Sequence, residues 1–255
     1  MNVKLIGHTQ LSFSFFENLI AIEDEPDWIF ENYGSGSETK DILLTAIRTC
    51  YSKNKPTEIL EKEGSKYFDN DEEGFKRLFE RIFNKGHHSV LEHINFTFAV
   101  EGVSRSLLAQ LTRHRHMSFS VQSQRYVAGG YDYVIPDSIK EREERCYHKD
   151  DYDLENPYTL AEVYNECLGY LDEVYRFFRL SGIPAEDARM ILPNAATTNL
   201  VVTMNLRTLF EFYAKRQRSK GAQEEIAQLA EALKEEVVEA EPWLNEYFEK
   251  VKEVS

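Results

Sequence analysis

Residues 94–126 read INFTFAVEGVSRSLLAQLTRHRHMSFSVQSQRY, and the local patterns in this stretch together indicate a mixed fold. Residues 94–103 alternate in polarity and are rich in β-branched and aromatic residues, which is typical of a strand. Residues 104–115 predict a helix. Residues 118–126 predict a strand or an extended loop, so an extended segment returns soon after the helix.

The rest of the chain continues this mixed pattern on both sides. Strands are expected over residues 2–7 and 197–206, and helices over 39–52, 71–86, 159–180, 207–219 and 222–241, with a short helical turn at 186–192. Thr39 is a candidate cap of the first helix, and Gly86 is the expected stop after the second. Residues 11–38 are interpreted as an irregular acidic excursion, and residues 140–156 as a charged loop. We therefore predict an α+β fold, a helix-rich single domain over residues 1–255 with a small, mainly antiparallel sheet.

The composition favours a folded protein and argues against several functional classes. Of the 255 residues, 42% are hydrophobic and 13% are aromatic, which is enough for a sizeable core. We expect no membrane span and no signal peptide, because no apolar run has the length that a bilayer requires and the first residues lack a basic leader. Three widely spaced cysteines favour a reducing, cytoplasmic location. The net charge of −14 argues against nucleic acid as a general partner.

Positive charge is nevertheless concentrated in two windows that contain no aspartate or glutamate. The first runs from Gly102 to Tyr131, where the average composition would place about five acidic residues, and it holds arginines but no lysine. The second runs from Arg189 to Phe210 and also contains Arg207. Arginine suits forked recognition of phosphate or carboxylate. The two windows are therefore predicted to form two walls of one anion site.

Residues 113–125, RHRHMSFSVQSQR, are the candidate centre of that site. Serine hydroxyls beside Arg125 are a common way to hold a phosphate. Ser123 is also a candidate nucleophile, although no G-x-S-x-G elbow surrounds it. Phe119 and Tyr126 leave open a role in stacking against nucleic-acid bases. Because the sequence has no glycine-rich phosphate loop, any nucleotide has to be held by side chains and helix ends.

The segment GHHSVLEH, residues 86–93, has three interpretations. As a metal site its histidines have the wrong spacing for one helix face, since they are adjacent or five residues apart, and we predict no metal. In the second interpretation the histidines serve the last carbonyl groups of the preceding helix. In the third, Ser89 caps a helix that begins at Val90, and the free N–H groups of that helix face a phosphate or a polar ring.

Several segments together resemble the flavin-dependent thymidylate synthases of the ThyX family. The tripeptide RHR at 113–115, followed after seven residues by Ser123, resembles the RHR-x7-S signature of that family. GHHSVLEH resembles the upstream histidine block, GIPAEDARMILP (182–193) the arginine-bearing turn, and MNLRTLFEFYAKR (204–216) the helix that ends in a catalytic arginine. The resemblance covers roughly residues 39–245.

The resemblance implies an assembly and a reaction. Members are homotetramers with active sites that several subunits build around FAD. The implied reaction converts dUMP to dTMP, with methylenetetrahydrofolate as carbon donor and with FAD reduced by NADPH as the hydride source. This family uses no cysteine nucleophile, and none of the three cysteines in this chain lies in an activating motif.

Matching positions imply a role for each candidate site residue. The implied FAD contacts are His87, Ser89, Arg113, His114, Arg115, Val121, Asn205, Arg207 and Glu211. The implied dUMP ligands are Gln110, Arg113, Ser123, Gln124, Arg125, Arg189 and Arg216. Arg216 is also the implied catalytic residue, because a guanidinium that faces the uracil ring would stabilise negative charge on N3 and O4 as C5 becomes nucleophilic. Val121 replaces a glutamate of some relatives and can offer only its backbone, and Glu211 replaces a neutral residue.

Two other classes of function stay open at this point. One is a nucleotide- or RNA-binding module that uses the arginine cluster, and the other is a metallohydrolase. Failure to bind FAD, or strong oligonucleotide binding with a steep salt dependence, would favour the first. Elemental analysis would identify the second.

Overall fold

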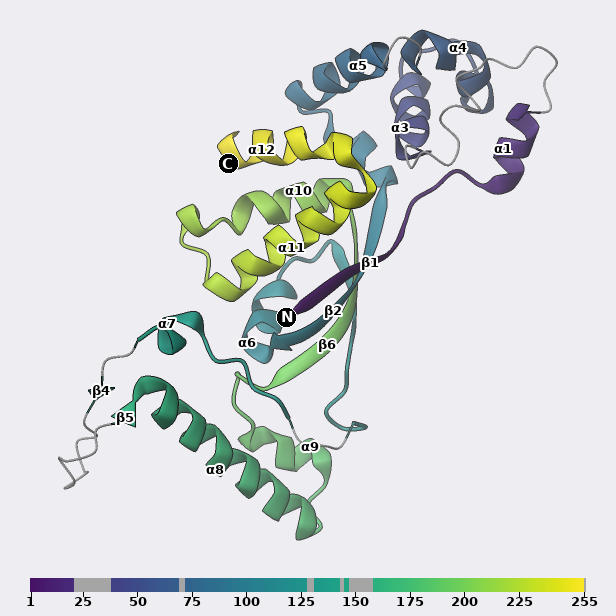
Figure 1. Ribbon diagram of the computed structural model, residues 1–255. Coiled ribbons are helices and arrows are strands. Elements are labelled where there is room, and N and C mark those ends of the chain that lie inside the picture. The colour runs from purple at the N-terminus through teal and green to yellow at the C-terminus, as the bar shows by residue number, and fades with distance from the viewer. Residues whose placement is uncertain (21–37, 69–71, 128–130, 143–144, 147–157, 255) are drawn as a thin grey trace.

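The computed structural model describes residues 1–20, 38–68, 72–127, 131–142, 145–146 and 158–254. A four-stranded antiparallel sheet with the order β1-β2-β6-β3 lies at its centre (Figure 1). The strands are β1 (Asn2–His8), β2 (Asn95–Ser104), β3 (Met117–Val121) and β6 (Thr197–Asn205). Two further short strands, β4 (Arg145–Cys146) and β5 (Tyr158–Thr159), pair with each other. The predicted α+β class with a small antiparallel sheet is confirmed.

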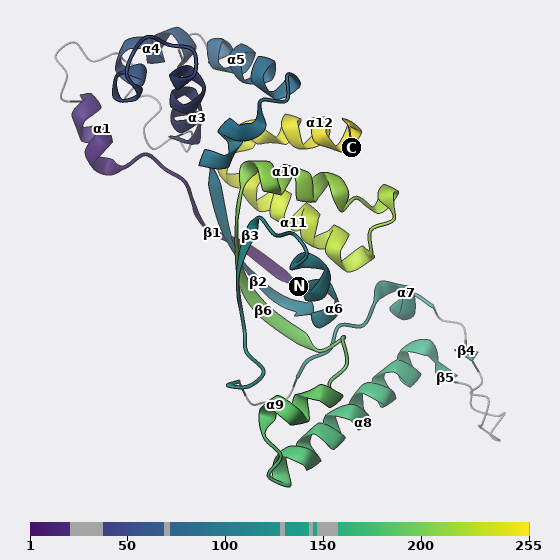
Figure 2. The same cartoon turned by 180° about the vertical axis from the view of Figure 1, so that it is seen from behind.

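Helices make up most of the rest of the described chain. They are α1 (Phe13–Ile20), α3 (Glu38–Thr49), α4 (Ile59–Phe68), α5 (Glu73–Asn84), α6 (Arg105–Leu111), α7 (Asp137–Lys140), α8 (Leu160–Leu180), α9 (Ala185–Ala188), α10 (Leu206–Lys215), α11 (Glu224–Ala240) and α12 (Asn245–Val254). Short 3-10 helices are η1 (Pro56–Glu58), η2 (His88–His93), η3 (Arg189–Ile191), η4 (Arg218–Lys220) and η5 (Pro242–Leu244). Both views show α3, α4 and α5 at one end of the molecule and α8 and α9 at the other (Figures 1 and 2). None of the described helices combines the length and the apolar character that crossing a membrane requires.

The central pair of strands, β2 and β6, sets the register of the sheet. Asn95 lies opposite Asn205 at one end, and Ser104 lies opposite Thr197 at the other. Alternate side chains of both strands enter the core, as the two-residue period of their sequences predicts. Gly102 lies where this register is irregular and has a φ of 67°, a conformation that favours glycine because a Cβ would be strained there.

The helix α10 is embedded in the core along most of its length. It therefore rigidly supports the candidate residues that it carries, Arg207 and Glu211. Leu206, Leu209 and Phe212 have no exposed surface, and burial of each such side chain contributes about 1.5–3 kcal/mol. Phe210 packs edge-on against Phe248 of α12, with 4.9 Å between the ring centroids. One hydrophobic cluster joins the four-stranded sheet to α1, α3, α4, α5, α6, α10, α11 and α12.

Most of the predicted elements are confirmed. The strands expected at 2–7, 94–103 and 197–206 are present, as are the helices expected at 39–52, 71–86, 159–180 and 222–241 and the helical turn at 186–192. The segment expected at 207–219 forms α10 and then η4. Gly86 follows α5 with a φ of 73° and acts as the expected stop. Thr39 is not a cap, because α3 begins one residue earlier at Glu38.

Other predictions are wrong in part, and the missed helices are short. The segment 11–38 is helical over α1, and residues 21–37 lie outside the described residues. Phe16 and Leu19 of α1 enter the core, whereas the acidic residues that follow had favoured an irregular structure. The helix α4 was not predicted either. Short amphipathic helices gain most of their stability from tertiary packing, which a local pattern does not reveal.

The extents of three segments also differ from the predictions. The helix predicted over 104–115 ends at Leu111, and the extended segment predicted over 118–126 is a strand only as far as Val121. The charged loop predicted over 140–156 contains β4, and most of its remaining residues lie outside the described part. Because α6 ends early, the RHR tripeptide is released into a turn.

Candidate functional site

The arginine turn, residues 113–115, lies between the end of α6 and the start of β3. Its backbone is held by the N–H of His114, which donates to the carbonyl oxygen of Leu111 at 3.0 Å. The His114 ring is half-buried and packs edge-on against Phe212 of α10, with centroids 5.0 Å apart. Its Nε2 lies 2.9 Å from Nη2 and 3.3 Å from Nε of Arg216. Residues 102 positions apart in the sequence, one from the signature and one from the end of α10, therefore meet directly.

Positive charge accumulates where the arginine turn meets Arg216. Burial, followed by the charge of Arg113, lowers the pKa of Arg216. Within the described ranges no carboxylate pairs with Arg216. Like charges held together in a partly buried place favour the binding of an anion. Gln110 of α6 lies one helical turn before Arg113, and its side-chain N–H donates to Gln223 Oε1 at 2.9 Å.

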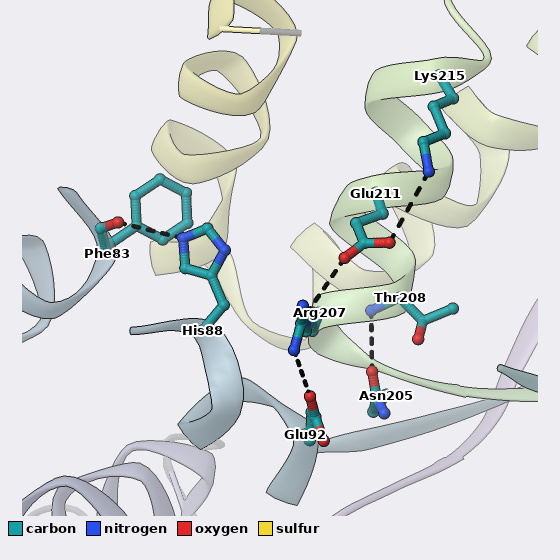
Figure 3. Close-up of polar contacts among 8 residues, drawn as sticks. All are labelled: Phe83, His88, Glu92, Asn205, Arg207, Thr208, Glu211 and Lys215. Atoms are coloured by element: carbon teal, nitrogen blue, oxygen red, sulfur yellow. Dashed lines mark hydrogen bonds and ion pairs between the residues drawn. The ribbon is translucent and has the colours of Figure 1, made fainter. Parts of the chain in front are cut away.

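A second group of candidate residues lies at the start of α10 (Figure 3). Asn205 caps this helix, since its Oδ1 accepts a hydrogen bond from the backbone N–H of Thr208 at 2.9 Å. Arg207 reaches Glu92 of η2 through Nη1 at 2.6 Å and Glu211 through Nε at 3.2 Å. These two carboxylates, Glu92 first, raise the pKa of Arg207.

One face of α10 thus presents charges of alternating sign. Glu211 lies 3.9 Å from Lys215 and also pairs with Arg207, and each of the three residues follows the previous one by four positions. The exposed fraction of each side chain is 43% or more, so each pair alone contributes less than about 1 kcal/mol to stability. The carboxylate of Glu211, the departure noted in the sequence, is neutralised by its own helix.

For the histidine segment, residues 86–93, the structure fully supports only one of the three interpretations. The Nε2 atom of His88 lies 3.2 Å from the carbonyl oxygen of Phe83, in the last turn of α5, as the carbonyl-serving interpretation predicts. Ser89 does not cap a helix, because η2 begins at His88 and no side-chain cap bond is present. His87 and Ser89 are exposed. Among the described residues, no group of three histidine, cysteine, aspartate or glutamate side chains is arranged to hold a metal ion.

A third group lies beyond the end of β3. Arg125 Nε is 3.4 Å from Glu186 Oε2, and Arg189 Nε donates to the backbone carbonyl of Glu186 at 3.3 Å. Ser123 and Gln124 line a pocket of about 180 Å³, together with Gln122, Val127, Tyr131, Asp132, Thr197, Thr198 and Asn199. The Ser123 hydroxyl accepts a hydrogen bond from the backbone N–H of Arg125 at 3.2 Å. Ser123 and Arg125 are therefore linked to each other, and Arg125 and Arg189 both contact Glu186, beyond the Val121 end of β3.

The strand β3 separates the third group from the arginine turn. Met117 pairs with Met204 and Val121 with Leu200, so the four steps along β3 span about 14 Å. Val121 itself is half-buried in this strand. A single protomer therefore brings His114 and Arg216 together at one end of β3, and Ser123 and Arg189 at the other.

The two acid-free windows lie side by side along β3 and β6, and both supply arginines to the third group, Arg125 from the first window and Arg189 from the second. They also meet near Arg105, because burial and then the charge of Arg189 lower the pKa of Arg105. Arg207, however, lies on α10 among carboxylates that come from outside the windows. The sequence analysis did not identify Glu92 or Glu186 as a partner of an arginine. Only the pair Glu186 and Arg189 had a local signal, because residues three positions apart in a helical turn are neighbours.

Comparison with known proteins supports the resemblance of the motifs. The profile of the Thy1 family, described as thymidylate synthase complementing protein, matches residues 35–243. The chain is 39% identical over 191 residues to the flavin-dependent thymidylate synthase of Geobacter sulfurreducens, covering 74% of this chain and 72% of the relative. It is 33% identical over 232 residues to the enzyme of the same name from Haloarcula marismortui, covering 83% and 91%.

The fold is also similar to a solved structure. The crystal structure of thymidylate synthase X from Helicobacter pylori with FAD and dUMP aligns with a TM-score of 0.62, at 24% identity, over 99% of both chains. At this identity the likeness concerns the fold alone. The profile match and the identities to the curated relatives establish that this chain belongs to the Thy1 family of flavin-dependent thymidylate synthases.

Proposed function

We propose that this protein converts dUMP to dTMP with bound FAD, takes the carbon from methylenetetrahydrofolate and takes the electrons from NADPH. Family membership supports the reaction, and one observation in this chain carries the proposal. The half-buried Arg216 meets the arginine turn in a place where Arg113 adds positive charge and where, among the described residues, no carboxylate offsets it.

Arg216 supplies hydrogen-bond donors to the charge that develops on the nucleotide. As C5 of the uracil becomes nucleophilic, negative charge spreads over N3 and O4, and a preorganised guanidinium stabilises it. Cys50 and Cys167 are exposed free thiols, and we assign neither of them a role in the reaction. Exposed free thiols also support the proposed cytoplasmic location.

The donor set fits FAD, whose pyrophosphate is anionic. Arg113 and Arg115 are exposed, and the Nδ2 group of Asn205 remains available because the cap bond uses only Oδ1. We also assign His87, Ser89 and the backbone of Val121 to this cofactor. The bound flavin supplies hydride transfer. Arg207 can contact an anionic cofactor only while it shares its donors with Glu92 and Glu211.

We assign the dUMP phosphate to the third group, which offers a serine hydroxyl at Ser123 and guanidinium donors at Arg125 and Arg189. Gln124 lines the adjoining pocket, and Gln110 lies near the arginine turn. Because β3 separates this group from Arg216, a complete site requires residues from more than one subunit. Large apolar side chains on α8 and η3, which are 66% to 89% exposed, support a homotetramer that covers them: Tyr170, Phe177, Leu180 and Met190. The core cluster that joins the four-stranded sheet to α1, α3–α6 and α10–α12 supports a single domain.

The test is release of tritium from [5-³H]dUMP by FAD-loaded protein supplied with methylenetetrahydrofolate and NADPH. Arg216→Leu is expected to reduce release by roughly a hundredfold or more, the loss typical for removal of one preorganised donor. Arg218→Leu is the matched control, since Arg218 lies two residues away and pairs with Glu224 on the surface at 2.6 Å. Absence of release by the folded, FAD-loaded wild type would refute the function. Full activity of Arg216→Leu would refute the role of Arg216.

A further inference from the structure

The contact between His114 and Arg216 defines the state of the imidazole. A guanidinium has five N–H donors and no acceptor. Both the 2.9 Å and the 3.3 Å contacts therefore run from Arg216 to His114 Nε2, whose single lone pair is shared by two N–H groups. An imidazole that accepts at Nε2 is neutral and carries its proton on Nδ1.

The surroundings of His114 favour this neutral form. Burial lowers its pKa below the usual 6.5, and the charges of Arg216 and Lys215 act in the same direction. Glu211, the one carboxylate that acts on the ring, opposes them. Phe212 covers one side of the ring edge-on, and Arg113 of the same turn adds a further positive charge beside Arg216.

The backbone of Arg216 is already fixed, so its guanidinium is the part that needs support. The Arg216 N–H donates to the carbonyl oxygens of Phe212 and Tyr213 at 3.0 Å and 3.2 Å at the end of α10. The buried side chain of Gln217 donates to the Tyr213 carbonyl at 2.8 Å and closes the same helix end. A long arginine side chain still has several rotatable bonds, and holding one rotamer has an entropic cost. His114 is the one described acceptor bonded to the guanidinium.

We propose that neutral His114 is the positioning residue for Arg216: it accepts two N–H groups of the guanidinium, orients the remaining three toward the substrate, and releases them when it is protonated. This inference rests on the proposed catalytic role of Arg216. It gives the histidine of the signature a role that is separate from contact with FAD. Protonation at Nε2 removes the acceptor and places a positive charge against Arg216, so the orientation is lost as the pH falls through the pKa of His114.

Two variants distinguish the positioning of Arg216 by His114 from a role of His114 in stability alone. His114→Leu removes the acceptor, whereas His114→Gln retains an amide oxygen at a similar reach and cannot titrate. At saturating FAD and dUMP, His114→Leu is expected to lower kcat by roughly tenfold or more, since a hydrogen bond to a charged group is lost. His114→Gln is expected to recover most of kcat. It is also expected to lack the acidic decline of kcat that we predict for the wild type as the pH falls through the lowered pKa of His114. FAD affinity is measured in parallel by quenching of flavin fluorescence.

Three outcomes would overturn the inference. In the first, kcat of His114→Gln is as low as that of His114→Leu. In the second, kcat of His114→Gln still declines at acidic pH. In the third, saturating FAD restores the kcat of His114→Leu. The last outcome would assign His114 to the cofactor alone.

A second measurement is independent of activity and therefore distinguishes failure of this inference from failure of the proposed function. In the FAD-loaded protein, ¹³Cε1 histidine NMR is expected to show His114 titrating below 6.5. Its pKa should rise in Arg216→Met, because a neighbouring positive charge is removed. A His114 pKa that does not respond to Arg216→Met would overturn the coupling, even if the wild type releases tritium.

Discussion

Replacing Asn205 by alanine removes the oxygen that caps α10, and the cost can be worked out from the structure. The Asn205 Oδ1 accepts from the N–H of Thr208 at 2.9 Å, and loss of such a cap costs typically about 1 kcal/mol. Thr208 is only 9% exposed, so water replaces the lost acceptor poorly and the cost rises to about 1.5 kcal/mol. For a chain of this size that corresponds to a fall in Tm of about 3–6 °C.

The assay is thermal unfolding of the FAD-free protein at matched protein concentration, with Asn205→Asp as the control. Aspartate keeps the capping oxygen and adds a negative charge at a helix N-terminus, so its Tm should stay within about 2 °C of wild type. Aspartate lacks the amide N–H group, so weaker FAD binding by this stable variant would show that Asn205 also contacts FAD. A Tm of Asn205→Ala within about 1 °C of wild type, or of Asn205→Asp as low as that of Asn205→Ala, would refute the capping argument.

Three further predictions concern charge, packing and pH. Glu211→Asn should tighten FAD binding about threefold or more, because it removes a carboxylate that competes for Arg207. The unfolding free energy should fall by no more than about 1 kcal/mol, since two exposed ion pairs are lost. Weaker binding in a fluorescence titration would contradict this prediction. Gly74→Ala should destabilise the protein by about 2 kcal/mol or more, because the Cβ of the new alanine would lie 2.6 Å from the backbone oxygen of Lys66. An unchanged midpoint of urea unfolding would contradict the close packing of α4 against α5. Burial raises the pKa of Glu63, but hydrogen bonds to its carboxylate outweigh burial and the net pKa lies below 4.5. Glu63→Gln should therefore be less stable than wild type at pH 7, and this difference in urea unfolding should shrink as the pH falls below 4.5; a constant difference would contradict the assignment.

Local patterns in the sequence carried the prediction of the central elements. The alternation over 94–103 predicted the central strand β2, because a strand with one buried face repeats every two residues, and its neighbour β6 was also predicted, over 197–206. The RHR-x7-S spacing together with the segments 86–93, 182–193 and 204–216 indicated the family, because such motifs can be recognised without knowing which residues pair in the fold. Local patterns failed for α1 and α4, whose stability comes from the core residues they contact.

The sequence by itself determined which residues were candidates for the site, because residue types and short spacings are written directly in the chain. Only the tertiary structure decided their partners. His114 bonds to Arg216 across 102 positions, and Arg207 to Glu92 across 115. Such pairs depend on the register of β3 against β6 and on where α10 leaves the sheet, and neither has a local signal. Long-range packing therefore placed His114 against Arg216, the proposed catalytic residue, and set carboxylates against Arg207, whereas the sequence predicted only a cluster of positive charge.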